Sequence, residues 1–188
     1  MIRSAEDIWN SSTAVRGTLG AEYLDALGVP EECEAVRFSL RAENSPAETM
    51  GLLPSVVFAF QNSAGIIGLT QHFIDPDTSE RVRRVAIGTP EKGIWLARPL
   101  TNSDDFPFLG KLCIAEGLER TIELTHKVDL PCAAVISQNG VSCLTFPQGV
   151  SELVIDDAQL SPERLEAIRS AMQSKAYLVS SLQEASSE

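Results

Sequence analysis

Apolar and polar positions follow different periods along the chain, and each period predicts a different kind of element. Residues 4–29 carry apolar side chains at helical spacing, and the break at Gly17 divides them into two helices. Further on, segments bounded by turn-forming residues alternate apolar with polar side chains, which is typical of an antiparallel meander. These predicted strands are residues 36–41, 56–74 (a hairpin of two strands), 81–87 and 94–97. Residues 42–53 are predicted to form a loop.

From about residue 111 the pattern changes to short apolar runs that alternate with helical stretches. The runs are residues 112–115, 132–136, 153–155 and 177–179, and the stretches between them are 118–127, 139–144 and 161–173. This order predicts a parallel sheet with helices on both faces. We therefore expect an α/β protein in which an α+β segment, residues 1–108, precedes an α/β domain at 109–182. The polar residues 183–188 are expected to form a flexible tail.

Composition narrows the class of protein. The chain has 188 residues, of which 44% are hydrophobic, enough for one domain or two small ones. No run approaches the roughly 18 apolar residues of a membrane span, and the N-terminus lacks the pattern of a signal peptide. We therefore expect a cytoplasmic protein with no membrane contact. The four cysteines form no CxxC pair, so Cys113 and Cys132 are predicted to be buried, reduced thiols.

The net charge of −11 excludes binding to nucleic acid through a broad basic surface. It leaves room for a local cluster, and the sequence offers one in Arg81, Arg83, Arg84 and Lys92. Arginines on a strand can contact the phosphates of a nucleic acid. They can equally form a solvated face that balances Glu80 and Glu91, and the sequence leaves both interpretations open.

Three carboxylates follow predicted parallel strands at the point where each strand ends. Glu116 follows the first strand, and Asp156 and Asp157 follow the third. Ligands of open parallel sheets bind at these strand ends, and two or three carboxylates suit Mg²⁺ or Mn²⁺. The alternative is structural, with Asp157 capping a turn and Glu116 placed for the helix dipole. Arg120, one turn into the following helix, is predicted to contact phosphate or to pair with Glu116 or Glu123.

The segment Leu112-Cys113-Ile114-Ala115-Glu116-Gly117-Leu118-Glu119-Arg120-Thr121-Ile122-Glu123-Leu124 resembles the first Toprim motif, an apolar strand that ends in Glu-Gly and runs into a helix. It is most similar to the Toprim-like domains of primase and helicase proteins from phages, plasmids and integrated mobile elements. The order of elements before it also resembles the segment that precedes Toprim in those proteins, so that the resemblance covers about residues 4–160.

The resemblance implies a Toprim-like parallel sheet, with Glu116 in acid/base work and a later Asp-x-Asp that binds Mg²⁺ or Mn²⁺. Here the second motif reads Ile155-Asp156-Asp157-Ala158, so one carboxylate is missing and the metal site is weakened. Two functions follow. One is metal-dependent, primase-like nucleotidyl transfer on DNA or RNA, with Glu116, Asp156 and Asp157 as metal ligands. The other is a catalytically degenerate module that binds nucleic acid or a replication protein. Oligomeric state stays open.

Overall fold

The chain folds into two compact units, Met1–Trp95 and Leu96–Glu188. The computed structural model describes residues 4–31, 33–40, 53–97, 110–158 and 160–185. The domain boundary predicted between residues 108 and 109, the predicted loop at 42–53 up to residue 52, and residues 186–188 of the predicted tail lie outside these ranges.

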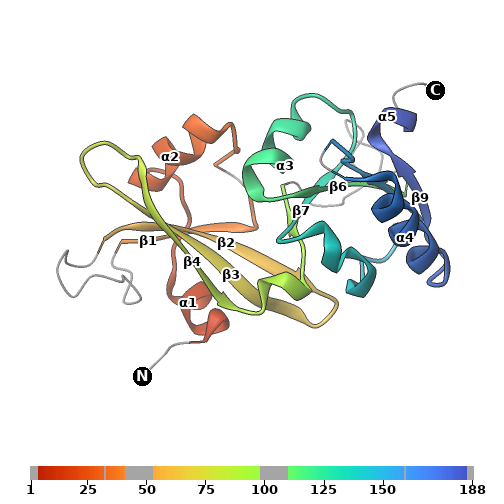
Figure 1. Cartoon of the computed structure of the whole chain (residues 1–188). Coiled ribbons are helices and arrows are strands. Elements are labelled where there is room, and N and C mark those ends of the chain that lie inside the picture. The colour runs from red at the N-terminus through yellow and green to blue at the C-terminus, as the bar shows by residue number, and fades with distance from the viewer. Residues whose placement is uncertain (1–3, 32, 41–52, 98–109, 159, 186–188) are drawn as a thin grey trace. The chain divides into compact units, whose positions relative to one another are not determined.

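The first unit is an antiparallel sheet of four strands with helices packed on it (Figure 1). Its strands follow one another in the sheet in chain order, β1-β2-β3-β4, which confirms the predicted meander over residues 36–87. The strand predicted at residues 94–97 is instead an edge strand of the other sheet, where Trp95–Leu96 lies beside Cys132–Val135. The strands are β1 (Val36–Ser39), β2 (Ser55–Asn62), β3 (Gly65–Ile74) and β4 (Arg81–Gly88). The helices are α1 (Ala5–Ser11), α2 (Leu19–Leu27) and the 3₁₀ helix η1 (Pro90–Lys92).

The helix α1 begins at a capping box, in which the Ser4 side chain accepts a hydrogen bond from the Asp7 backbone and the Asp7 side chain accepts one from the Ser4 backbone. Its apolar face is buried against the inner strands of the sheet. The members of this cluster are Ala5, Ile8, Trp9, Val57, Ala59 and Leu69. The apolar residues of α1 share one face because they follow the helical period of 3.6. They pack on residues of β2 and β3 that share one face because they follow the strand period of two.

His72 lies in β3 and is fully buried. The strand is an inner one, with β2 and β4 on either side, and Tyr23 of α2 covers it. The Tyr23 hydroxyl and His72 Nδ1 are 2.7 Å apart, a hydrogen bond that joins α2 to the sheet. Such burial of a polar side chain depends on a hydrogen-bond partner, which the strand's own sequence does not reveal.

The second unit contains a five-stranded sheet in the order β5-β7-β6-β8-β9, whose edge strand β5 begins at Trp95, the last residue of the first unit. The sheet has three parallel pairs, β6–β7, β6–β8 and β8–β9. Figure 1 shows α3 on one face of this sheet and α4 on the other. The strands are β5 (Trp95–Leu96), β6 (Lys111–Glu116), β7 (Cys132–Val135), β8 (Glu152–Ile155) and β9 (Leu178–Ser181). The helices are α3 (Leu118–Thr125), the 3₁₀ helix η2 (Gln138–Cys143), α4 (Pro162–Gln173) and α5 (Leu182–Ala185).

Cys113 and Cys132, which the sequence predicted to be buried, reduced thiols, are buried free cysteines on neighbouring strands. Their mutual hydrogen bond and their burial raise the pKa of Cys113, so it stays protonated. Residues 183–185 of the predicted tail belong to the helix α5, whose first residue, Leu182, packs against the cluster around Cys113.

Candidate functional site

The turn from β6 into α3 places Glu116 at the carboxyl edge of the parallel sheet. Glu116 is the last residue of β6 and its side chain is exposed. Gly117 follows with φ +84° and ψ 155°, a backbone conformation that is essentially restricted to glycine. The Gly117 N–H donates to the Val135 carbonyl at 2.9 Å, and its own carbonyl accepts from the Thr121 hydroxyl at 2.8 Å. The turn is therefore held on both sides while the carboxylate before it faces solvent.

Asp156 lies at the same edge, directly after β8. Its backbone N–H donates to the Ile114 carbonyl at 2.9 Å, which ties the residue to β6. The residue is only 6% exposed. A carboxylate this buried requires a counter-charge and hydrogen bonds.

Arg120 of α3 supplies both. Its Nε donates to Asp156 Oδ2 at 2.6 Å, and its Nη2 donates to Asp156 Oδ1 at 2.9 Å, a bidentate pair that occupies both carboxylate oxygens. Its remaining nitrogen, Nη1, donates to Glu123 Oε2 at 2.9 Å. Hydrogen bonds to Asp156 and then to Glu123 raise the pKa of Arg120 above its usual value, so the guanidinium is always charged.

The ion pairs continue along the exposed face of α3. Lys127 donates to the second carboxylate oxygen of Glu123, four residues before it. The hydrogen bonds from Lys127 and then from Arg120 lower the pKa of Glu123. The predicted pairing of Arg120 with Glu123 is thus confirmed, whereas the predicted phosphate contact by Arg120 requires that it leave Asp156.

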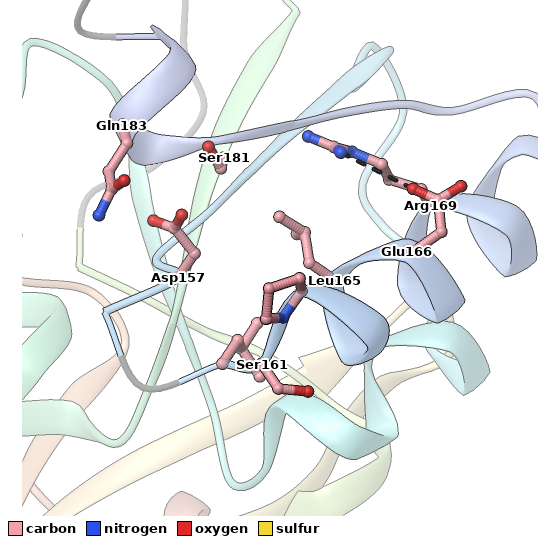
Figure 2. Close-up of a pocket in the computed structure, with 9 residues that line it drawn as sticks. Asp157, Ser161, Leu165, Glu166, Arg169, Ser181 and Gln183 are labelled. Carbon is pink, nitrogen blue, oxygen red and sulfur yellow. Dashed lines mark ion pairs between the residues drawn. The ribbon is translucent and has the colours of Figure 1, made fainter.

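Asp157 lies in a different environment from Asp156, although the two are consecutive. It lines an open pocket of about 640 Å³ between the end of β8, α4 and the segment from β9 into α5 (Figure 2). The figure shows its carboxylate on the side of Ser181 and Gln183, while Glu166 and Arg169 form an ion pair of 3.8 Å on α4. No residue that lines this pocket comes from α3.

The strand register explains why the three predicted metal ligands do not come together. Val154 pairs with Cys113, and the alternation of a strand places Asp156 on this same face, towards α3. Glu116 and Asp157 each lie three residues beyond this pair, an odd number, so the alternation places them on the opposite face of the sheet. Among the residues that the structure describes, no group of three or more His, Cys, Asp or Glu is placed to hold a metal ion. With both oxygens of Asp156 on Arg120, the residues as they stand do not fit a bound divalent cation.

The basic cluster of the first unit lies on β4, which forms one edge of the antiparallel sheet. Arg81, Arg83 and Arg84 are all exposed. Arg83 pairs with Phe73 and Arg84 with His72, so these two arginines project from opposite faces of the strand. Lys92 is exposed in η1, beyond the far end of β4, and the rise of a strand puts that end about 13 Å from Arg84. The three arginines therefore lie near one end of β4, distributed over both of its faces, and Lys92 lies apart from them.

The sequence predicted the charged residues Glu116, Arg120, Asp156 and Asp157 at this edge, but not the pair that Arg120 forms with Asp156. The Arg120–Asp156 contact joins residues 36 positions apart, and no spacing rule signals it. The Arg120–Glu123 pair was predicted from helical spacing, and the same rule applied to Glu123 and Lys127, four residues apart, would have predicted the second ion pair.

A family model described as a domain of unknown function (DUF7146) matches residues 1–94, half of the chain. The chain belongs to this family. No curated protein matches the sequence. Of the helices in the described ranges, none combines the length and the apolar character that crossing a membrane requires.

Two solved structures share the fold. One is the crystal structure of the Aquifex aeolicus primase (zinc-binding and RNA polymerase domains), with a TM-score of 0.53 and 11% identity over 95% of this chain and 53% of that chain. The other is the DnaG primase catalytic domain bound to ssDNA, with a TM-score of 0.50 and 12% identity over 91% of this chain and 63% of that chain. This chain thus spans less than two thirds of either solved chain. The similarity shows a primase-related α/β fold, as the sequence predicted.

Proposed function

We propose that this chain is a primase-related protein that acts on nucleic acid by nucleotidyl transfer at the carboxyl edge of β6 and β8. The observation that supports it best is the position of Glu116, an exposed carboxylate at the end of a parallel strand in a primase fold. Reactive groups of parallel sheets lie at such strand ends. The glycine turn that follows leaves room for a substrate to approach the carboxylate.

In this proposal Glu116 acts as the general base that accepts the proton of an attacking hydroxyl group. A carboxylate can do so only if solvent and substrate reach it, and Glu116 meets that condition. Asp156 cannot take this role while Arg120 occupies both of its oxygens. Mg²⁺ or Mn²⁺ remains the proposed cofactor, and it can bind Asp156 only in a form of the protein in which this ion pair has opened.

The proposed partner is single-stranded nucleic acid, because one of the structures that shares the fold is described as bound to ssDNA. The exposed arginines of β4 are the proposed phosphate contacts on the first unit. With a net charge of −11, such a local group is expected to give weak, strongly salt-dependent binding. Binding of a replication protein, an origin in a phage, plasmid or integrated element, and a cytoplasmic location all stay predictions from the sequence.

The decisive experiment compares template-dependent oligonucleotide synthesis by the wild type and by Glu116→Gln. The assay contains single-stranded DNA, nucleoside triphosphates and Mg²⁺ or Mn²⁺. We expect Glu116→Gln to lose activity by about 10²–10⁴-fold, the usual contribution of a general base. Glu119→Gln removes the same charge from an exposed site three residues later and is expected to keep activity.

Binding of a fluorescent single-stranded oligonucleotide, measured by anisotropy, should be the same for all three proteins. Wild-type binding without any synthesis would overturn nucleotidyl transfer and leave the chain as a non-enzymatic binding module. Equal losses of activity in Glu116→Gln and Glu119→Gln would show that charge, and not the position of Glu116, matters.

A further inference from the structure

We propose that the pocket beside α4 binds a guanine nucleotide, with the base on Asp157 and the phosphate on Arg169. The pocket has a volume of about 640 Å³, within the usual range for small-molecule sites. It lies at the carboxyl ends of β8 and β9, where ligands of parallel sheets bind. Glu116 is not among the described residues that line it. Binding here is therefore independent of the proposed reaction at Glu116.

Asp157 places a carboxylate at one end of the pocket. The residue is half-buried, and within the described part of the chain no hydrogen bond or ion pair involves its side chain. Asp156, directly before it, has both oxygens on Arg120. An ionised carboxylate offers two adjacent acceptor oxygens and no donor. Asp157 is therefore suited to a ligand that presents two N–H groups side by side.

An apolar wall forms the middle of the pocket. Leu160, Pro162 and Leu165 line it, and none of the three is buried. Pro162 and Leu165 are three residues apart and share one face of α4. Figure 2 shows Leu165 between Asp157 and Arg169. Such a wall can cover one face of a flat aromatic ring, because the contact removes apolar surface of both from water.

Arg169 provides a cation beyond this wall. It lies about one turn of α4 after Leu165, and its side chain is 25% exposed. Its contact with Glu166 is 3.8 Å, longer than a hydrogen bond, and the Glu166 side chain is 72% exposed. Exposed ion pairs of this kind contribute little free energy. A phosphate group can therefore compete with Glu166 for the guanidinium, which binds two phosphate oxygens at once.

The order of these groups favours guanine over the other purine base. Guanine carries its N1–H and its 2-amino group side by side, which matches two acceptor oxygens, and the ribose links its flat ring to a phosphate. Adenine presents an acceptor nitrogen beside its amino group. That nitrogen would face a carboxylate oxygen, and two acceptors that face one another leave both without a donor.

The test measures binding of guanosine monophosphate (GMP) to the intact chain by isothermal titration calorimetry. The wild type, Asp157→Asn and the control Asp129→Asn, which changes an exposed aspartate outside the pocket, are titrated in parallel. We expect Asp157→Asn to bind GMP about 10–100-fold more weakly, because a hydrogen bond to a charged group is lost. Asp129→Asn should match the wild type.

A complementary ligand separates recognition of the base from a structural role of Asp157. Xanthosine monophosphate has an oxygen in place of the 2-amino group of GMP, and asparagine has an amide donor in place of one carboxylate oxygen. Asp157→Asn should therefore bind xanthosine monophosphate at least about tenfold more tightly than the wild type does. A variant that binds both nucleotides more weakly than the wild type would overturn recognition of the base by Asp157.

The phosphate end is tested with Glu166→Gln, which removes the anion beside Arg169. We expect this variant to bind GMP about two- to fivefold more tightly, because the phosphate no longer competes with an ion pair. Binding of guanosine, which has no phosphate, should stay unchanged. Equal effects on GMP and guanosine would overturn the placement of the phosphate on Arg169.

The wild type alone covers the case in which Asp157→Asn does not fold. Inosine monophosphate lacks only the 2-amino group of GMP, and we expect it to bind about tenfold more weakly. Equal binding of these two nucleotides, or no binding of GMP at millimolar concentration, would overturn the inference.

The same titrations distinguish this site from the proposed function. If the wild type and Asp157→Asn bind GMP equally, the nucleotide lies elsewhere and the inference fails, while the proposed function stands. If Asp157→Asn loses GMP binding but the wild type makes no oligonucleotide, the proposed function fails and the guanine site stands.

Discussion

Gly117 forms the turn that directly follows the exposed carboxylate of Glu116. Its φ of +84° and ψ of 155° belong to a region that L-amino acids with a Cβ atom almost never adopt. The space around it is open, since the nearest atom to an added Cβ is Glu119 Oε2 at 4.0 Å. Substitution is therefore expected to act through backbone strain and not through a clash.

We predict that Gly117→Ala lowers the free energy of unfolding by about 1–3 kcal/mol, the usual cost of such a strained conformation. Urea denaturation followed by circular dichroism measures the change. Gly17→Ala is the comparison, because Gly17 has φ +70° with nothing within 4 Å of an added Cβ. That position is in the ordinary left-handed region, where the cost is about 1–2 kcal/mol. A Gly117→Ala protein as stable as the wild type would show that the turn relaxes.

Asp156 and Arg120 show that the type of a residue does not by itself determine what the residue binds. A strand-end aspartate and a nearby arginine predicted a metal ligand and a phosphate contact. In the structure each satisfies the other. The pair neutralises a buried carboxylate, and it occupies both oxygens of the one predicted metal ligand that the strand register turns towards α3.

The exposed arginines of β4 support two roles, protection of a sheet edge and contact with phosphate. This strand is an edge strand, and edge strands commonly carry charged side chains that prevent pairing with other chains. Its arginines can serve this purpose, contact phosphate, or do both. The same three exposed side chains thus support the structural and the functional interpretation from the sequence.

We predict that replacing Arg83 and Arg84 together with Ala weakens binding of single-stranded DNA. The slope of log affinity against log salt concentration should fall in magnitude by about 0.7 for each phosphate that the protein no longer neutralises. Anisotropy titrations at several salt concentrations measure both quantities. Arg16→Ala removes an exposed arginine from the loop between α1 and α2 and serves as the control. Unchanged affinity, together with new aggregation of the double variant, would assign β4 to edge protection alone.

The whole molecule carries a net charge of −11 on 188 residues. Repulsion among excess charges of one sign destabilises a compact state, and salt screens it over about 10 Å at 0.1 M. The partly buried Arg120–Asp156 pair is screened less than fully exposed charges are. Repulsion should therefore dominate the response of stability to salt.

We predict that the melting temperature rises when NaCl is increased from about 0.05 M to about 0.5 M, a range over which screening becomes strong. Differential scanning fluorimetry measures the shift. A variant with Asp25→Asn, Glu31→Gln and Glu91→Gln, three exposed sites, reduces the net charge from −11 to −8 and should respond less to salt. A melting temperature that falls with salt in both proteins would show that ion pairs, and not repulsion, dominate.

The sequence by itself determined the features that depend on neighbours along the chain. Helical spacing predicted α1, α2, α3 and α4, and apolar alternation predicted the meander of the first unit. The helical stretch predicted from residue 161 matches α4, which begins at Pro162 after the Ser161 cap, and the predicted Glu-Gly turn follows β6. Such signals are readable because hydrogen bonding, capping and backbone sterics act within a few residues.

Only the tertiary structure decided which of these residues meet. The strand register turned Asp156 towards Arg120 and Asp157 towards a separate pocket, although the sequence places them side by side. It also buried His72 beneath Tyr23 and anchored the tail through Leu182. These outcomes depend on contacts between distant segments and on the pleat of the sheet, whose period of two sends consecutive residues to opposite faces. The sequence predicted the Glu116–Gly117 turn, whereas only the tertiary structure showed that Arg120 pairs with Asp156.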